Sequence, residues 1–282
     1  MIKTGFIGAG KVGFSLGKFF SEGEIQVTGY YDRHRESAQE AAEFTNSKCY
    51  DSIEEIVRSS DAIFLTVPDG LITEVYESLK DYDIRNKQIC HCSGAMSAGE
   101  AFPGIGSEGA EGYSIHPLFP VSNKLTVYRE LGDAFFCIEG TDEAGLMLWK
   151  QRLEALGPKV QMISGEKKSK YHAACAISSN LVCALIDKSV ELLQDCGFTE
   201  EGALEALEPL VMSNVKHLVE DGAVKALTGP LERGDAGTIK KHLSVIGDTG
   251  LYVEASKRLI SIASKKNPDR DYSEIRELLK KE

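Results

Sequence analysis

The sequence predicts an α/β protein in which a doubly wound parallel sheet is followed by an all-helical domain. Up to Ser164, short apolar strands alternate with amphipathic helices, and this order builds a parallel sheet with helices on both faces. From Gly165 to Glu282 only helical periodicity is found. We therefore expect a sheet domain over residues 1–164 and an all-helical domain over residues 165–282.

The elements follow from the apolar patterns in order. Residues 61–67 form a continuous apolar run, which is typical of a strand buried on both faces. The expected strands cover residues 3–7, 25–31, 48–50, 61–67, 87–93, 112–116, 134–139 and 159–163, and the expected helices between them cover 14–20, 36–44, 52–58, 71–79 and 141–156.

In the second domain, residues 167–196 predict one long helix that is apolar over most of its circumference. Such a helix should be buried, and a second subunit is one candidate for the covering surface. Shorter helices are expected over residues 200–219, 237–243, 249–263 and 273–279.

The composition limits the classes of function. With 42% hydrophobic and 27% charged residues, the chain reads as a soluble globular protein, and its net charge of −11 argues against a general nucleic-acid binder. No apolar run reaches the roughly 18 to 20 residues that cross a bilayer, and no leader-type segment precedes the first strand. We expect a cytoplasmic protein without membrane or nucleic-acid partners.

The seven cysteines are an odd number and lie mostly inside expected strands and helices, which indicates reduced thiols. Cys90-His91-Cys92 lacks a second ligand pair at zinc spacing. Alternation along a strand also directs the two thiols to one face and His91 to the other. We expect no metal site.

The first strand runs directly into a glycine-rich turn, Gly8-Ala9-Gly10-Lys11-Val12-Gly13, and a helix follows. In this pattern the first glycine allows the turn, the second lets the backbone approach a pyrophosphate, and the third lets helix and strand pack closely. The helix N-terminus then faces the anion. Asp32 ends the second strand about 20 residues later, where an acidic side chain binds a ribose hydroxyl. The pattern predicts a dinucleotide site.

Polar residues at the carboxyl ends of the other strands are the candidates for chemistry, because ligands bind at that edge of an open sheet. Val67-Pro68-Asp69 should pass beside the cofactor, although Pro68 could simply start a helix. Ser93 should lie close to a nicotinamide, or else cap a turn. His116 could exchange a proton with a substrate near neutral pH, or be a satisfied histidine at a strand end.

Two further groups come from the helical domain. His172 and Ser179 fall within about 20° of each other on a regular helix and Asn180 within about 80° of His172, whereas Lys170 faces away. Buried polar groups need partners, so we expect His172 and Asn180 to face the substrate. In the segment 228–235, Arg233 could bind the carboxylate of a substrate or form an ion pair with Asp235. We favour the ion pair, which would have a structural role.

Over its whole length the chain resembles a family of Rossmann-fold proteins grouped with NADP oxidoreductases, in which a dinucleotide domain precedes a helical domain of unknown function (DUF2520). More distantly it is similar to prephenate, 6-phosphogluconate and 3-hydroxyisobutyrate dehydrogenases and to pyrroline-5-carboxylate and ketopantoate reductases. The stretches that carry the resemblance are Gly8 to Gly13, Val67-Pro68-Asp69, Ser114-Ile115-His116-Pro117-Leu118, Tyr171-His172-Ala173-Ala174 with Ser179-Asn180, and Thr228-Gly229-Pro230 through Arg233-Gly234-Asp235.

Ser93 and His116-Pro117 resemble the serine and histidine-proline motifs of prephenate dehydrogenases, where the histidine handles the substrate hydroxyl. The hydroxy-acid branch of the superfamily places a catalytic lysine four residues before an asparagine. Here Asn180 is present but residue 176 is alanine, so the resemblance does not extend to that lysine. The resemblance also implies a homodimer formed through the helical domain.

The expected function is an NAD(P)-dependent oxidoreductase that moves a hydride to or from a small carbonyl, hydroxyl or imine substrate in an interdomain cleft. The alternative is a dinucleotide-binding sensor without turnover. Asp32 favours NAD, whereas Arg33 and Arg35 could pair with a 2′-phosphate and favour NADP, to which the resemblance also inclines. The expected catalytic residues are His116, His172 and Asn180, and the expected cofactor-binding residues are Gly8, Gly10, Val12, Gly13, Asp32, Arg33, Val67, Pro68 and Ser93.

Overall fold

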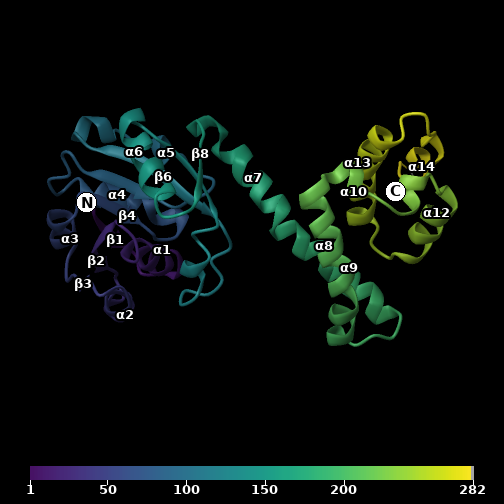
Figure 1. Ribbon diagram of the computed structural model, residues 1–282, viewed down its shortest axis with the longest axis horizontal. Helices are drawn as coiled ribbons and strands as arrows, with labels where there is room; N and C mark the ends of the chain where they lie inside the picture. Colours follow the sequence, from purple (N-terminus) through teal and green to yellow (C-terminus); the bar gives the residue numbers. More distant parts are fainter. Residues whose placement is uncertain (281–282) are drawn as a thin grey trace. The chain divides into compact units, whose positions relative to one another are not determined.

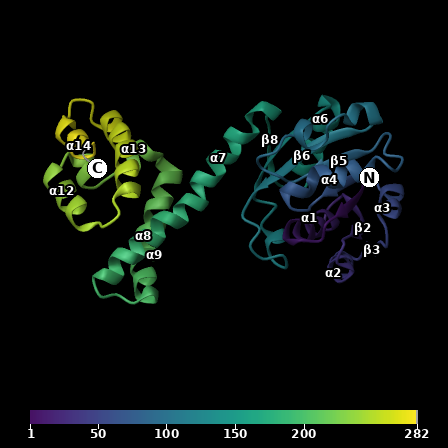
Figure 2. The same ribbon diagram turned by 180° about the vertical axis from the view of Figure 1, so that it is seen from behind.

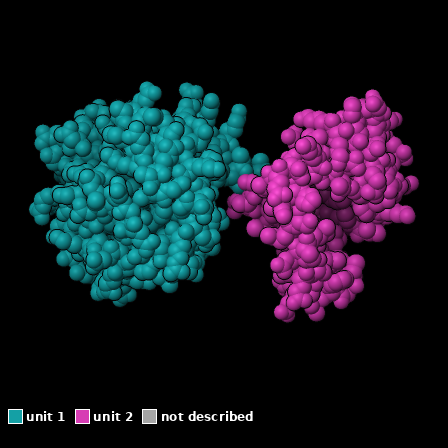
Figure 3. Space-filling view, viewed as in Figure 1, with its two compact units in different colours: residues 1–177 teal, residues 178–282 magenta. Residues whose placement is uncertain are grey.

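The computed structural model describes residues 1–280, which form two compact units, the first over residues 1–177 and the second from Ser178 onward (Figure 3). The last strand ends at Met162. The first unit therefore continues beyond the sheet into the start of the helical region.

The first unit is built on one sheet of eight strands in the order β3-β2-β1-β4-β5-β6-β7-β8. The first six strands in this order are parallel neighbours, as the sequence predicts. The strands are β1 (Lys3–Ile7), β2 (Gln26–Tyr31), β3 (Lys48–Cys49), β4 (Ala62–Leu65), β5 (Gln88–His91), β6 (Glu111–Leu118), β7 (Phe135–Gly140) and β8 (Lys159–Met162).

The sheet departs from the expected parallel pairing at one place, because β6 and β7 pair antiparallel. Parallel neighbours need a crossover, usually a helix. Between Leu118 and Phe135 the chain forms only a single 3₁₀ turn, Val127–Arg129, so β7 returns beside β6 in the opposite direction.

Helices cover both faces of the sheet, which confirms the doubly wound arrangement (Figures 1 and 2). One apolar core joins the sheet to α1, α2 and α6 and includes the buried Phe14, Phe20 and Trp149. A second core joins the opposite face to α3, α4 and α5 through Ile56 and Tyr76. The helices are α1 (Lys11–Ser21), α2 (Arg35–Thr45), α3 (Ile53–Ser59), α4 (Ile72–Leu79), α5 (Ala98–Ala101) and α6 (Glu143–Glu154).

The expected single helix over residues 167–196 is divided into α7 (Lys168–Ser178) and α8 (Asn180–Asp195). Ser179, between them, has φ −124° and ψ −71°, outside the helical region. Its hydroxyl donates to Asn180 Oδ1 at 3.2 Å. Short polar side chains compete with the helix for hydrogen bonds, which accounts for a break at Ser178-Ser179-Asn180.

The helical stretch over residues 165–195 differs from expectation in two further ways. It is long and apolar enough to cross a membrane on length and composition alone, because an 18-residue window within it has a mean hydropathy of 1.3. It is also mostly exposed instead of buried: in α8 only Val190 is buried, and Leu181 is 53% exposed. This apolar surface lacks cover within a single chain, as far as the described residues extend.

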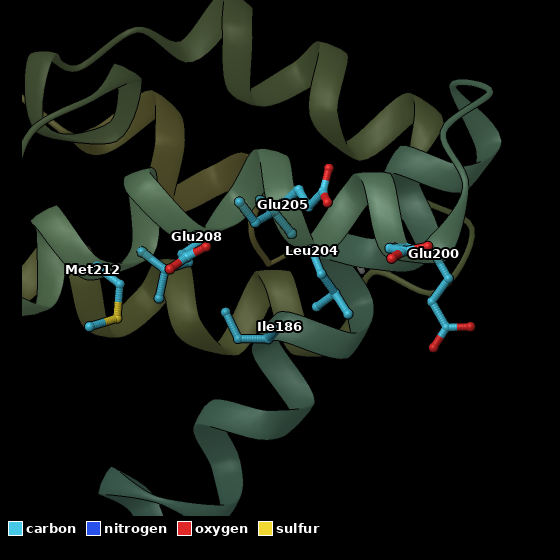
Figure 4. A pocket seen from close by; sticks show the side chains of 9 residues that line it. Ile186, Glu200, Leu204, Glu205, Glu208 and Met212 are labelled. Carbon is cyan, nitrogen blue, oxygen red and sulfur yellow. The ribbon is translucent and has the colours of Figure 1, made fainter.

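In the second unit, α8 packs beside α9 (Glu200–Asp221), and a small bundle follows. A pocket of about 720 Å³ on this pair has an apolar floor that includes Ile186, Leu204 and Met212, with glutamates around it (Figure 4). The bundle core contains Leu231, Ile239, Val253, Ile260 and Tyr272. The remaining helices are α10 (Ala223–Ala226), α11 (Pro230–Arg233), α12 (Ala236–Val245), α13 (Gly250–Lys266) and α14 (Ser273–Leu278).

The four shorter helices expected in this unit are confirmed as α9, α12, α13 and α14, and α10 and α11 were not expected. Through Lys280 the second unit contains no strand, in agreement with the sequence pattern.

Candidate active site

The glycine loop joins the end of β1 to the start of α1. Gly8 has φ +102°, and a Cβ there would lie 2.7 Å from the carbonyl oxygen of Thr66, at the end of β4. A Cβ on Gly13 would lie 2.5 Å from the Gly8 carbonyl oxygen. The positive φ of Gly8 and the close packing around Gly13 both exclude a side chain, as the sequence predicts.

Gly10 differs from these two glycines. Its backbone is extended, with φ −72° and ψ −175°, and a Cβ on it would meet no described atom within 4 Å. The packing of the protein itself does not require glycine at this position. Gly10 is also the N-cap of α1, where no side chain caps the free N–H groups. The missing side chain thus keeps space open at the positive end of a helix, which suits an anion.

A pocket of about 320 Å³ opens at this loop. It lies at the carboxyl ends of β1, β2 and β4 and against α4. It brings together six of the expected cofactor-binding residues, namely Gly8, Gly10, Asp32, Arg33, Val67 and Pro68. Val12, Gly13 and Ser93 are not among the residues that line it.

Asp32 holds the glycine loop. Its Oδ2 accepts a hydrogen bond from the Ala9 amide and its Oδ1 accepts one from the His34 amide, both at 2.8 Å. Arg35 pairs with the exposed Asp51. Arg33 lines the pocket and, within residues 1–280, forms no ion pair. Of the two arginines considered for a 2′-phosphate, Arg33 is therefore the available one.

Ser93 lies just after β5 and is buried. Its hydroxyl donates to Asp69 Oδ2 at 2.6 Å and accepts from the amides of Ala95 and Met96. The hydroxyl therefore caps the turn that follows β5, and it also ties this turn to the one that follows β4.

His116 is half-buried near the end of β6, and its Nδ1 lies 2.8 Å from the hydroxyl of Tyr171 on α7. The exposed His172 stands against it, with the ring centroids 6.4 Å apart and an interplanar angle of 80°. Burial, with the electrostatic effects of Lys168 and His172, lowers the pKa of His116 to about 4. His116 is therefore neutral near pH 7, while burial raises the pKa of Tyr171 and keeps its phenol protonated.

Lys168, the first residue of α7, is a member of this group that the sequence patterns did not single out. It is 1% exposed, and its Nζ donates to the Ser93 carbonyl oxygen at 2.9 Å and to Ser114 Oγ at 2.7 Å. Burial lowers the pKa of Lys168. No motif marks this position, because three lysines stand within four residues and only the fold decides which one is buried.

His91 is fully buried on β5, where its ring stands edge-on to Phe102 at 5.3 Å. Its Nδ1 accepts the Ser93 amide at 3.1 Å, and burial lowers its pKa to about 3. Cys90 and Cys92 pack in the core of the opposite sheet face, as the alternation predicts. No group of metal-binding side chains occurs within the described part of the chain.

The other candidates lie in the second unit. Asn180 starts α8, in the second unit. The expected Arg233–Asp235 pair is wrong for the described structure, in which no such ion pair occurs. Asp235 instead caps α12, accepting from the amide and hydroxyl of Thr238 at 2.9 and 2.7 Å. Arg233 is exposed.

The mostly parallel sheet, its strand order and the glycine loop at the first strand define a dinucleotide-binding type of fold. Comparison with protein families agrees: residues 1–117 match the Rossmann-like domain, and residues 134–259 match a domain of unknown function, DUF2520. The chain thus joins a Rossmann-like domain to a DUF2520 domain, the combination that its motifs indicated.

Among solved structures, protein TM1727 from Thermotoga maritima is 27% identical, with a TM-score of 0.73 over 93% of this chain and 99% of that one. The 1-pyrroline-5-carboxylate reductase of Streptococcus pyogenes is 16% identical, with a TM-score of 0.65 over 94% and 98%. A reductive aminase from Aspergillus terreus, solved with NADPH and ethyl-5-oxohexanoate, is 14% identical, with a TM-score of 0.62 over 94% and 93%. At 16% and 14% identity, the last two similarities show a shared fold alone. No curated protein matches the chain.

Proposed function

We propose that the protein is an NAD(P)-dependent oxidoreductase acting on a small carbonyl, hydroxyl or imine substrate. The observation that carries the proposal is Gly10. Its missing side chain serves no packing need and leaves open the space at an uncapped helix N-terminus beside a pocket. The likeness of the fold to reductases, one of them solved with NADPH, supports the same activity.

The residues of the first unit fit a dinucleotide. The free amides of α1 would bind the pyrophosphate, and Asp32 would hold the loop in shape and reach a ribose hydroxyl with its remaining lone pairs. Arg33 would pair with a 2′-phosphate, which favours NADP. A bound nicotinamide would supply or accept the hydride. His116 would exchange a proton with the substrate oxygen or nitrogen, and His172 and Asn180 would orient the substrate.

Titration of the purified protein with NADPH and NADH, followed by nicotinamide fluorescence, tests the cofactor proposal. We expect Arg33→Ser to weaken NADPH binding about tenfold or more, equivalent to about 1.4 kcal/mol, and to leave NADH binding unchanged. Arg35→Ser is the matched control, because Arg35 is already paired with Asp51, and it should change neither affinity. Failure of the wild-type protein to bind either nucleotide would contradict the proposed site.

A non-catalytic NAD(P) sensor is the second candidate. The observation in its favour is the low pKa of His116, which makes this histidine a weak base. A sensor would bind the nucleotide as tightly as an enzyme does but would show no turnover with any substrate of the three classes.

We also propose a soluble, cytoplasmic homodimer in which a second copy covers the apolar surface of α8 and α9. Leu181, Leu185, Leu210, Met212 and Val219 are exposed on these helices, and an exposed patch of this kind usually marks an interface. The second copy presents the same apolar surface, so the contact can be self-complementary.

Sedimentation equilibrium tests this assembly. The wild-type protein should sediment as a dimer and the double variant Leu181→Asp/Leu210→Asp as a monomer, since two buried carboxylates would each lack a partner. Val245→Asp on α12 is the control, because Val245 is 75% exposed but lies on neither helix. A wild-type monomer that binds lipid vesicles would instead favour a membrane for the apolar helix.

A further inference from the structure

Lys168 is unusual because its charged end is buried without a carboxylate beside it. The side chain is 1% exposed, and its Nζ donates to two neutral acceptors, the Ser93 carbonyl oxygen and Ser114 Oγ. Among the described residues it takes part in no ion pair. Removing an ammonium ion from water costs several kcal/mol, and neutral acceptors offset only part of this. An apolar residue would stabilise the fold more, so the lysine needs another explanation.

We propose that Lys168 is a positioning residue, whose ammonium ion fixes the Ser93–Gly94 turn on strand β6 and, together with burial, disfavours protonation of the His116 imidazole. The catalytic meaning of this inference rests on the proposed function, whereas the effect on His116 is a property of the ligand-free protein.

The first part of the inference follows from the contacts of the turn. The ammonium group of Lys168 donates a hydrogen bond to the carbonyl oxygen of Ser93. The next residue, Gly94, lies against the imidazole rings of His116 and His172. A Cβ on Gly94 would lie 2.5 Å from His172 Cδ2 and 2.9 Å from His116 Nε2. A shift of the turn by a few tenths of an ångström would therefore move the rings of His116 and His172.

The second part follows from the charges around His116. Tyr171, His172 and Lys168 face it from the α7 segment, His91 from β5, and Cys137 from the opposite position on β7. Of these five side chains, only Lys168 is a fixed cation near neutral pH. Its positive charge opposes protonation of the neighbouring imidazole, because two like charges repel strongly where water is excluded.

The carboxylates of Glu139 and Asp69 favour the charged form of Lys168, since their electrostatic effect, like that of Cys137, opposes the lowering of its pKa by burial. Among the described residues, neither Glu139 nor Asp69 forms an ion pair with Lys168. The ammonium ion is therefore not neutralised by direct contact, and its charge still acts on His116.

An uncharged imidazole has a definite consequence for the proposed reaction. It can accept the proton when a substrate O–H bond breaks, forming an N–H bond, as the carbon gives up its hydride to an oxidised nicotinamide cofactor. The imidazolium formed next to Lys168 is then disfavoured and passes the proton on, for which the exposed His172 is the neighbouring acceptor. Lys168 thus favours rapid return of His116 to its base form.

The test is an NMR titration of the His116 imidazole in the ligand-free, full-length protein, with the signal assigned by loss in His116→Asn. In the wild type the pKa should lie near 4, and in Lys168→Met it should rise by about one unit or more. Lys170→Met is the matched control, because Lys170 is an exposed lysine on the same helix, and it should leave the titration unchanged.

Ser114→Ala tests the positioning part without removing the charge. It deletes one acceptor of the ammonium ion and also the hydrogen bond that the Ser114 hydroxyl donates to the Ser93 carbonyl oxygen at 3.3 Å, so the amide resonance of Gly94 should shift and kcat should fall more than KM changes, while NADPH affinity is retained. A shift of the same resonance in Lys168→Met, but not in Lys170→Met, assigns the effect to the ammonium ion. If Lys168→Met does not fold, Lys168→Gln keeps two N–H donors without the charge and gives the same titration test.

An unchanged His116 pKa in a folded, uncharged Lys168 variant would overturn the electrostatic part, and an unchanged Gly94 resonance in Ser114→Ala would overturn the positioning part. Loss of cofactor binding by the wild-type protein would count against the proposed function alone, because the titration needs no cofactor.

Discussion

Replacing Gly10 with valine should lower the affinity for a nicotinamide dinucleotide about 100-fold or more, equivalent to about 2.7 kcal/mol, and leave the fold intact. No described atom lies within 4 Å of the position of its Cβ, so the protein can accommodate the first atom of a new side chain. The extended backbone at Gly10 also suits a β-branched residue. The isopropyl group would instead occupy the space that faces the helix N-terminus, where the pyrophosphate is proposed to bind.

The neighbouring Gly13→Val should have the opposite effect. Its Cβ would come within 2.5 Å of the Gly8 carbonyl oxygen, so the helix must move away from the strand and the free energy of unfolding should fall by a few kcal/mol. Gly106→Val is the control for Gly10, because its Cβ position is open as well but lies in a 3₁₀ turn at Ile105–Glu108, outside the pocket. Nucleotide titration and thermal unfolding separate the two effects, and undiminished nucleotide binding by Gly10→Val would remove the main support for the site.

His116→Ala should reduce turnover about 10²- to 10⁴-fold and leave cofactor affinity unchanged. His116 is not among the residues that line the nucleotide pocket, so its loss removes the proton acceptor without touching the binding surface. The measurement is kcat with the best substrate from a screen of hydroxy acids, oxo acids and imines, beside fluorescence titration of the same variant. The same screen distinguishes the enzyme from the sensor, because a sensor would give no turnover to lose.

The pH dependence follows from the pKa of His116, which burial and Lys168 lower to about 4. In the direction that oxidises a hydroxyl, His116 must be neutral, so activity should persist across the neutral range and fall only as the pH drops through about 4. A fall centred near the ordinary histidine pKa of about 6.5 would show that another group accepts the proton. Tyr171→Phe would retain the ring against His116 and remove its hydroxyl partner, which makes it a control for orientation.

Much of the fold could be predicted from local patterns. The strands and most of the helices repeat apolar residues with the periods of their structures, and the glycine loop has local geometric requirements. Two features differed from the prediction, the antiparallel pairing of β6 with β7 and the break between α7 and α8. The first depends on residues far apart in the chain, and the second on side chains that compete with the helix for hydrogen bonds. The pairing of β6 with β7 depends on how the chain returns after Leu118, and the break at Ser179 depends on short polar side chains in an otherwise helical run.

The sequence by itself determined the doubly wound sheet, the helical second half and the glycine loop, because apolar periodicity and backbone sterics act over a few residues. Only the tertiary structure decided which side chains form the candidate active site. Lys167, Lys168 and Lys170 are chemically equivalent in the sequence, yet Lys168 alone of the three is buried, on Ser93 and Ser114. Burial and the charges of neighbouring elements set the protonation of His116, and those neighbours come together only when β5, β6 and α7 have packed.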